Sequence, residues 1–179
     1  MLRGRRAARP QADSGSARGA ASRPAPSLKS VALRLLARRD FGREELAERL
    51  RARGGEDSDV AATLDELATL GFVSDIRTAE TLVASRRGAF GRRAIAQALK
   101  DRRIEPEVAA AALEPLAGVD EAAEALVLWQ RRFGTLPRDQ REKARHVRFL
   151  MARGYPMGVA LKVLRLAGTA LDEAEHDGS

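Results

Sequence analysis

The stretch Phe41-Gly42-Arg43 recurs 49 residues later as Phe90-Gly91-Arg92. The correspondence continues downstream at the same offset without an insertion, and it pairs Leu50 with Leu99. Self-similarity at a fixed period of about 20–50 residues is typical of repeat architectures. The sequence therefore predicts tandem structural repeats, and the functional question becomes what surface they present together.

A weaker third copy follows, because Leu50-Arg51-Ala52-Arg53-Gly54 reappears 100 residues later as Leu150-Met151-Ala152-Arg153-Gly154. Apolar residues recur at helical spacing throughout, as Leu28, Val31, Ala32 and Leu35 do in the first segment. No alternating strand pattern interrupts them. We therefore predict an all-α protein of nine helices in three three-helix repeats, which span residues 28–74, 75–118 and 119–168.

Residues near the ends of these segments are typical of helix caps. Gly42 and Gly91 are expected to open the second helices of their repeats, and Pro137 is expected to open that of the third. Asp57 or Ser58 is expected to cap the third helix of the first repeat, and Ser74 the helix that follows.

The two ends of the chain differ in composition from the repeats. Residues 1–27 contain six arginines and one aspartate, and their only bulky apolar residues are Met1 and Leu2. Organellar transit peptides are also rich in arginine and poor in acidic residues, but this segment lacks the apolar residues for an amphipathic helix. We predict a disordered basic tail at 1–27 and a disordered acidic tail at 169–179.

Composition restricts the class of protein. The net charge is +7, from 32 basic and 25 acidic residues, which favours a polyanionic or acidic partner. The absence of cysteine excludes disulfides and thiol catalysis and is compatible with a reducing cytoplasm. No apolar run reaches the roughly 20 residues of a transmembrane helix.

The sequence contains few residues in patterns suited to catalysis. The chain has two histidines, and His146, beside Arg145, is expected at the surface or in an interface. A phosphate-binding GxxxxGK[ST] loop is absent, and the adjacent acidic pairs Glu44-Glu45 and Asp65-Glu66 fit a solvated face. We therefore expect no enzyme, no metal and no cofactor.

The aromatic residues are expected in the core. Phe41 and Phe90 occupy equivalent positions and are expected to seal the bend between first and second helices. Trp129 and Tyr155 are expected to anchor the third core, because base-stacking proteins interleave more exposed aromatics with basic residues.

Clustered basic residues are the candidate binding groups. Within the repeated phrase, only Arg43 and Arg92 are left to face a partner. Arginine binds phosphate and carboxylate in a bidentate manner, so the clusters are expected to contact DNA or a protein partner. The candidates are Arg43, Arg86, Arg87, Arg92, Arg93, Lys100, Arg102, Arg103, Arg131, Arg132, Lys143, Arg145, Arg148 and Arg153.

The sequence from residue 28 to about 166 resembles the RecX family of bacterial regulatory proteins. The motifs that carry the resemblance are Phe41-Gly42-Arg43-Glu44-Glu45-Leu46, Leu70-Gly71-Phe72-Val73, Ser85-Arg86-Arg87-Gly88, Phe90-Gly91-Arg92-Arg93-Ala94-Ile95, Arg132-Phe133-Gly134 and Arg153-Gly154-Tyr155. Two positions depart from the family pattern. Thr78 stands where an aromatic is usual, and Arg103 stands where a turn glycine is common.

The resemblance implies an elongated, curved array that binds in the groove of the RecA–DNA filament. By similarity, the chain would be a cytoplasmic, monomeric inhibitor of RecA recombinase, ATPase and co-protease activities, with DNA contact inside the filament. An independent basic helical module that binds DNA alone, in the manner of a helix-turn-helix, is the alternative. The resemblance leaves open whether the protein caps filament ends or lies along the groove.

Overall fold

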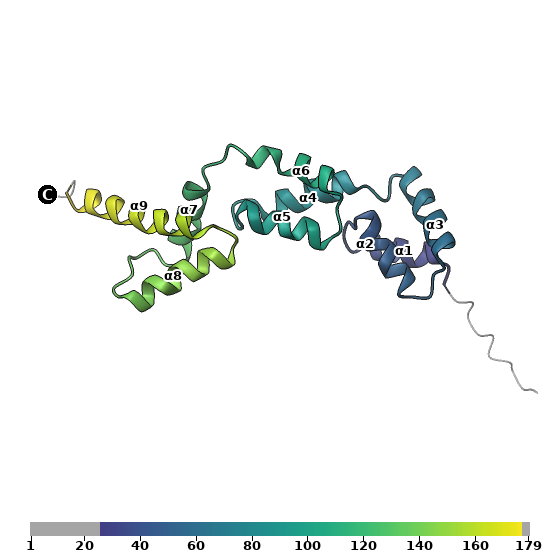
Figure 1. Ribbon diagram of the computed structural model, residues 1–179, viewed down its shortest axis with the longest axis horizontal. Coiled ribbons are helices and arrows are strands. Elements are labelled where there is room, and N and C mark those ends of the chain that lie inside the picture. The colour runs from purple at the N-terminus through teal and green to yellow at the C-terminus, as the bar shows by residue number, and fades with distance from the viewer. Residues whose placement is uncertain (1–25, 177–179) are drawn as a thin grey trace, which may run out of the picture.

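The computed structural model describes residues 26–176 of the 179-residue chain. Within this range the protein is all-α, and its helices follow one another along the long axis of the molecule as an elongated array (Figure 1). This confirms the predicted fold class. The predicted disorder of residues 1–25 and 177–179 lies outside the described residues.

The helices of the described range form three successive groups. The bounds are α1 Leu28–Leu36, α2 Arg43–Arg51, α3 Asp57–Thr69, α4 Asp75–Arg86, α5 Arg92–Asp101, α6 Pro106–Leu113 with the 3-10 turn η1 Glu114–Leu116, α7 Glu121–Arg132, α8 Gln140–Ala152 and α9 Met157–His176. No helix in this range is both long enough and apolar enough to cross a bilayer.

Each group of three helices encloses its own hydrophobic core. Leu50, Leu99 and Leu150 occupy equivalent places in the three cores, and each is fully buried. Trp129 and Tyr155 are also buried in the third core, at 2% exposure each, which confirms their expected role as core anchors. The repeated sequence thus encodes a repeated packing unit.

Helix ends confirm some expected caps and correct others. Ser74 caps α4 by accepting a hydrogen bond from the Arg77 amide. The expected cap of α3 was wrong, because Glu56 is the N-cap and Asp57 already belongs to the first turn.

Two further helix bounds differ from prediction in the last repeat. Helix α8 begins at Gln140 rather than Pro137, because the Asp139 side chain accepts from the Glu142 amide at 2.7 Å and caps the helix there. Helix α9 continues to His176, so residues 169–176 are helical rather than part of a disordered tail. The alanines and leucine of this segment are strong helix formers and extend the helix beyond the core.

Candidate functional site

The repeated Phe-Gly-Arg phrase forms the joints between successive repeats. At the first joint, the Thr78 hydroxyl of α4 donates to the Phe41 carbonyl at 3.2 Å. Gly42 lies so close to the turn after α5 that a Cβ would stand 2.8 Å from Ile104 Cδ1. This close approach explains why position 42 is a glycine. Thr78 departs from the family pattern, and its buried hydroxyl has a structural role at the joint.

The second joint repeats this arrangement with Gly91. The Gly91 amide donates to the Arg153 carbonyl at 2.9 Å, and a Cβ there would lie 3.0 Å from the Gly154 carbonyl oxygen. The Tyr155 ring is equally close to that position. Both glycines are also the N-caps of their helices, as expected.

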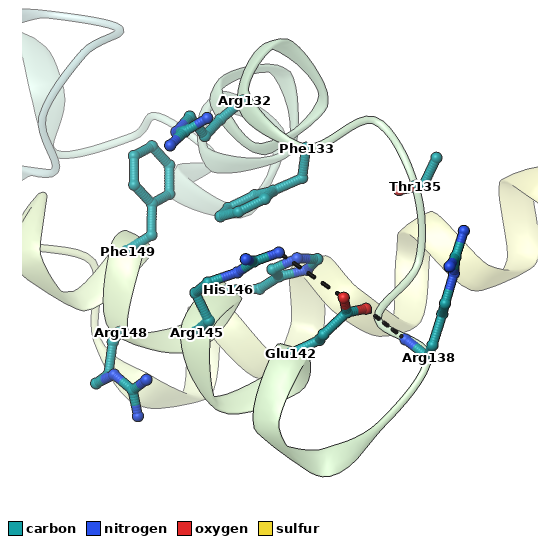
Figure 2. A pocket seen from close by; sticks show the side chains of 9 residues that line it. All are labelled: Arg132, Phe133, Thr135, Arg138, Glu142, Arg145, His146, Arg148 and Phe149. Atoms are coloured by element: carbon teal, nitrogen blue, oxygen red, sulfur yellow. Dashed lines mark hydrogen bonds and ion pairs between the residues drawn. The ribbon is translucent and has the colours of Figure 1, made fainter.

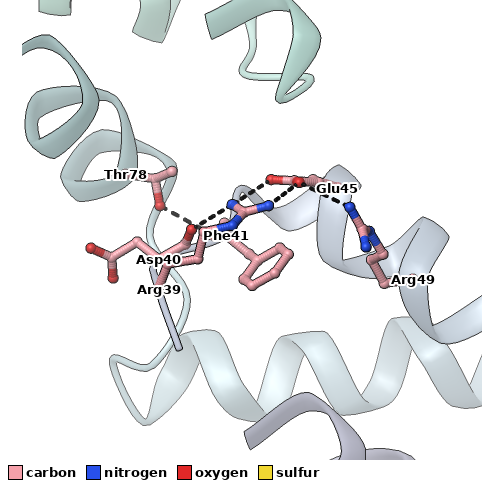
Figure 3. A network of polar contacts seen from close by, with 6 residues as sticks. All are labelled: Arg39, Asp40, Phe41, Glu45, Arg49 and Thr78. Atoms are coloured by element: carbon pink, nitrogen blue, oxygen red, sulfur yellow. Dashed lines mark hydrogen bonds and ion pairs between the residues drawn. The ribbon is translucent and has the colours of Figure 1, made fainter. Parts of the chain in front are cut away.

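Contacts beside the first joint correct one prediction, that for Glu45, whose partners are shown in Figure 3. The Arg43 guanidinium lies 2.6 Å from the Asp65 carboxylate in an exposed ion pair, so its contact with a partner stays a prediction. Glu45 does not belong to a solvated face, since it accepts from Arg39, whose guanidinium stacks 3.7 Å above the buried Phe41 ring. The sequence missed these contacts because Asp65 and Arg39 lie outside the repeated phrase.

Basic side chains meet again where the first repeat joins the second. Arg102 ends α5 and is half-buried, and burial lowers the pKa of its guanidinium. The neighbouring positive charges of Arg39 and Arg86 lower this pKa further, while Glu45 and Asp40 oppose the change. The charges of three guanidinium groups from two repeats therefore act on one another.

From Arg86 a run of cations and rings continues into the third repeat. The Arg86 and Arg153 guanidiniums lie 5.2 and 5.1 Å from the Phe90 ring centre, and Arg153 also lies 5.3 Å from Phe149. Arg153 further donates to the Ala89 carbonyl at 3.3 Å. Phe90 is half-buried and holds these guanidiniums at the joint.

The run ends at a hollow of about 680 Å³ between the end of α7 and the exposed side of α8 (Figure 2). Phe133 and Phe149 meet edge to face there, with ring centres 5.3 Å apart. The Arg132 and Arg145 guanidiniums lie 5.5 and 5.7 Å from the Phe133 ring centre. We call this the third-repeat hollow, and its lining residues are Arg132, Phe133, Thr135, Arg138, Glu142, Arg145, His146, Arg148 and Phe149.

We call the whole run the arginine ridge, formed by Arg39, Arg102, Arg86, Arg153 and the four arginines of the hollow, Arg132, Arg138, Arg145 and Arg148. Among the residues that the structure describes, Arg86, Arg132, Arg148 and Arg153 have no carboxylate within 4 Å. Stacking on rings holds several of these cations without neutralising them, so they can still bind an anion.

His146 corrects another prediction, because it lies at the base of the hollow and is only 2% exposed. Its ring stacks on Phe133 with centres 3.8 Å apart, and its Nδ1 accepts from the Trp129 indole N–H at 3.3 Å. Burial lowers the pKa of the imidazole and Arg145 lowers it further, whereas Glu142 raises it. A neutral imidazole is the form that can accept this bond, so His146 is part of the core beneath the arginines.

The remaining predicted binding residues are paired, exposed or next to other hollows. Arg103 pairs with Glu48 at 2.6 Å, and Arg87 lies 3.9 Å from Glu124. Lys143 faces a separate depression against α9. The others are exposed: Arg92, Arg93, Lys100 and Arg131.

Sequence reasoning missed three contributors to this surface. Arg39 and Arg138 precede helices α2 and α8 and fall outside the matched positions of the repeat. Phe149 is followed in the sequence by the buried Leu150, so its partly exposed position on α8 was not evident from the sequence. The Arg-Phe pairs in the sequence were a usable signal, since Arg132-Phe133 and Arg148-Phe149 both reach the hollow.

The described residues contain no cluster of three His, Asp or Glu side chains suited to a metal ion. The arrangement consists of cations and rings on a rigid helical support. Its chemistry is that of binding anions.

Comparison with known proteins places this chain in a family. Three domain models of the RecX family match in order, the first three-helix domain at residues 29–67, the second at 74–113 and the third at 120–164. The regulatory protein RecX of Chromobacterium violaceum is 40% identical over 151 residues, which cover 84% of this chain and 96% of that protein. The regulatory protein RecX of Leptothrix cholodnii is 40% identical over 160 residues, with 89% and 99% covered.

Solved structures share the fold. The crystal structure of RecX from Lactobacillus salivarius matches with a TM-score of 0.63 at 16% identity, covering 79% of this chain and 95% of that one. A second crystal structure, of a regulatory protein RecX, gives 0.62 at 19% identity, with 76% and 70% covered. Because three domain models match in order and relatives share 40% identity over most of their length, the chain belongs to the RecX family of regulatory proteins.

Proposed function

We propose that this protein is a cytoplasmic, monomeric regulator that binds the RecA–DNA filament and inhibits RecA recombinase, ATPase and co-protease activities. Family membership supports a regulatory role, since the relatives are named regulatory proteins. The observation that carries the proposal is the arginine ridge, whose cations without a carboxylate partner in the described range come from the second and third repeats. An elongated basic surface matches an elongated, polyanionic nucleoprotein better than a single small ligand.

The alternative, a helix-turn-helix module that reads duplex DNA alone, fits this chain less well. Such modules place the N-terminal residues of a recognition helix against the bases of the major groove. The N-termini of α2 and α5 are covered at the joints, where Asp75 and Glu121 accept from their first amides. Helix α3 begins with Asp57 and Asp59, whose charges would repel phosphate.

The decisive experiment measures ATP hydrolysis by the cognate RecA on single-stranded DNA while the protein is titrated. We expect inhibition below one protein per RecA subunit, because a bound regulator blocks growth of a filament rather than a single active site. Unchanged hydrolysis and filament growth at an excess of the protein would contradict the proposal. Tight binding to duplex DNA without RecA, with an affinity that falls steeply as salt rises, would favour the alternative.

A pair of double variants tests the ridge in the same assay. Arg86→Gln with Arg153→Gln removes two ridge cations that have no carboxylate partner among the described residues. We expect the concentration for half-maximal inhibition to rise about tenfold, the size expected when two charged contacts to a polyanion are lost. The control, Arg38→Gln with Lys162→Gln, removes equal charge at exposed positions off the ridge and is expected to inhibit normally.

A further inference from the structure

The third-repeat hollow combines the two kinds of group that bind single-stranded nucleic acid. It places Arg132, Arg138, Arg145 and Arg148 around the partly exposed rings of Phe133 and Phe149, with Glu142 as its one acidic residue. Glu142 accepts from the Arg138 amide at 2.9 Å and lies 3.9 Å from the Arg145 guanidinium, so its single negative charge offsets one of the four positive charges. The hollow therefore retains an excess of positive charge.

Size and shape fit a nucleotide unit. The volume of about 680 Å³ lies within the roughly 300–1,000 Å³ of small-ligand sites. One face of Phe133 is covered by His146, whose ring centre is 3.8 Å away. Phe149 meets Phe133 with its ring nearly perpendicular, at 87°, so its ring is the one placed to contact a base (Figure 2).

We propose that the third-repeat hollow binds one nucleotide of single-stranded DNA, with the backbone phosphate on Arg132 and Arg145 and the base against Phe149. A phosphate gains charge-assisted hydrogen bonds from paired guanidiniums. A base gains stacking on the ring, which a carboxylate of an acidic peptide cannot obtain. The base must be unpaired to reach the ring, which selects single-stranded over duplex nucleic acid.

The rest of the ridge supplies a path for the neighbouring nucleotides of the strand. Arg153 lies 5.3 Å from the Phe149 ring centre and 5.1 Å from Phe90, on the side toward Arg86. Successive phosphates can therefore follow the ridge from the hollow toward the second repeat. The RecA filament holds single-stranded DNA, so this site would contact DNA within the filament. That cellular role of the site rests on the proposed function.

The test measures binding of the full chain to fluorescein-labelled oligothymidylate by anisotropy at low salt, without RecA. Arg145→Gln is expected to weaken binding about three- to tenfold and to reduce the salt slope by about 0.7, the value for one lost phosphate contact on a single strand. Arg141→Gln, on the same helix but outside the hollow, is expected to bind within twofold of the unchanged protein. Fluorescence of Trp129, the one tryptophan, checks that the third repeat remains folded.

An abasic oligonucleotide isolates the stacking contact. The affinity of Phe149→Leu for oligothymidylate is expected to fall about fivefold or more, which corresponds to the lower end of the energy of a base–aromatic contact. Its affinity for the abasic strand is expected to equal that of the unchanged protein, because neither protein can stack on a base that is absent. Equal losses with both strands would overturn the assignment of the base to Phe149.

A competition with polyglutamate separates nucleic acid from acidic protein segments. Displacement of oligothymidylate by polyglutamate at equal charge concentration would overturn the proposal, as would an Arg145→Gln variant no weaker than Arg141→Gln. Since RecA is absent, these failures leave inhibition of RecA hydrolysis unaffected. The two proposals therefore fail separately.

Discussion

Arg103 has a left-handed backbone conformation at the end of α5, with a φ of 55°. The equivalent residues of the other repeats are Gly54 and Gly154, with φ of 86° and 89°. A side chain in this region costs about 1–2 kcal/mol because Cβ crowds the following carbonyl. Arg103 keeps the fold despite this cost, and its guanidinium pairs with Glu48 of the first repeat at 2.6 Å.

At this position we expect Arg103→Gly to be more stable than Arg103→Ala by about 1 kcal/mol, because both lose the ion pair and only glycine relieves the backbone. Urea unfolding of the two variants measures the difference. The ion pair itself is half-exposed and is expected to contribute less than about 1 kcal/mol. Equal stability of the glycine and alanine variants would show that the backbone of Arg103 is not strained.

Helices α2 and α5 depend on the following repeat for their N-terminal caps. Both begin after a glycine that has no side chain to accept from the first turn. Asp75 of α4 accepts from the Arg43 amide at 2.6 Å, and Glu121 of α7 accepts from the Arg92 amide at 3.1 Å. A cap donated by a neighbouring element joins helix formation to the assembly of the array.

For these caps we expect Asp75→Ala to destabilise the protein by about 1–2 kcal/mol, the range for loss of an N-terminal cap. Asp57→Ala is the matched control, since Asp57 is also an aspartate at the first position of a helix. Its contact is an exposed ion pair with Arg51 at 2.7 Å, so its loss is expected to cost less than about 1 kcal/mol. Equal losses on thermal unfolding would mean that the cap across the joint contributes nothing specific.

Between residues 26 and 176 the molecule consists of three separate cores linked by narrow joints. Every pair of helices in extensive contact belongs to a single repeat, so the repeats meet through turns and helix ends. In such arrays, stability is approximately the sum of repeat terms and nearest-neighbour terms. The ridge crosses both joints, so the relative position of the repeats decides whether its cations align.

At this scale we expect Leu50→Ala, Leu99→Ala and Leu150→Ala each to cost about 2–5 kcal/mol, because each empties an equivalent, fully buried site. Amide hydrogen exchange is expected to show the loss of protection mainly in the repeat that carries the change. Trp129 fluorescence is expected to respond to Leu150→Ala at lower denaturant than to Leu50→Ala. A uniform loss of protection along the chain would show instead that the array unfolds as one unit.

Part of the functional surface could be predicted from the sequence, and part could not. Arg145 and Arg148 are three residues apart on one helix, so their shared face follows from helical geometry. Arg86 and Arg153 are 67 residues apart, and only the second joint brings both to the Phe90 ring. The burial of His146, which was expected at the surface or in an interface, has a similar cause, because its neighbours Trp129 and Phe133 come from α7 and its C-cap.

The sequence by itself determined the order of the helices in the described range, the period of the repeat and most residues of the three cores. These depend on local spacing and side-chain volume, and both can be read along one chain. Only the tertiary structure decided which cations are neutralised and which remain available. Ion pairs such as Arg43 with Asp65 and Arg103 with Glu48 require distances between separate helices, and so does the stacking that holds Arg86 and Arg153 on Phe90.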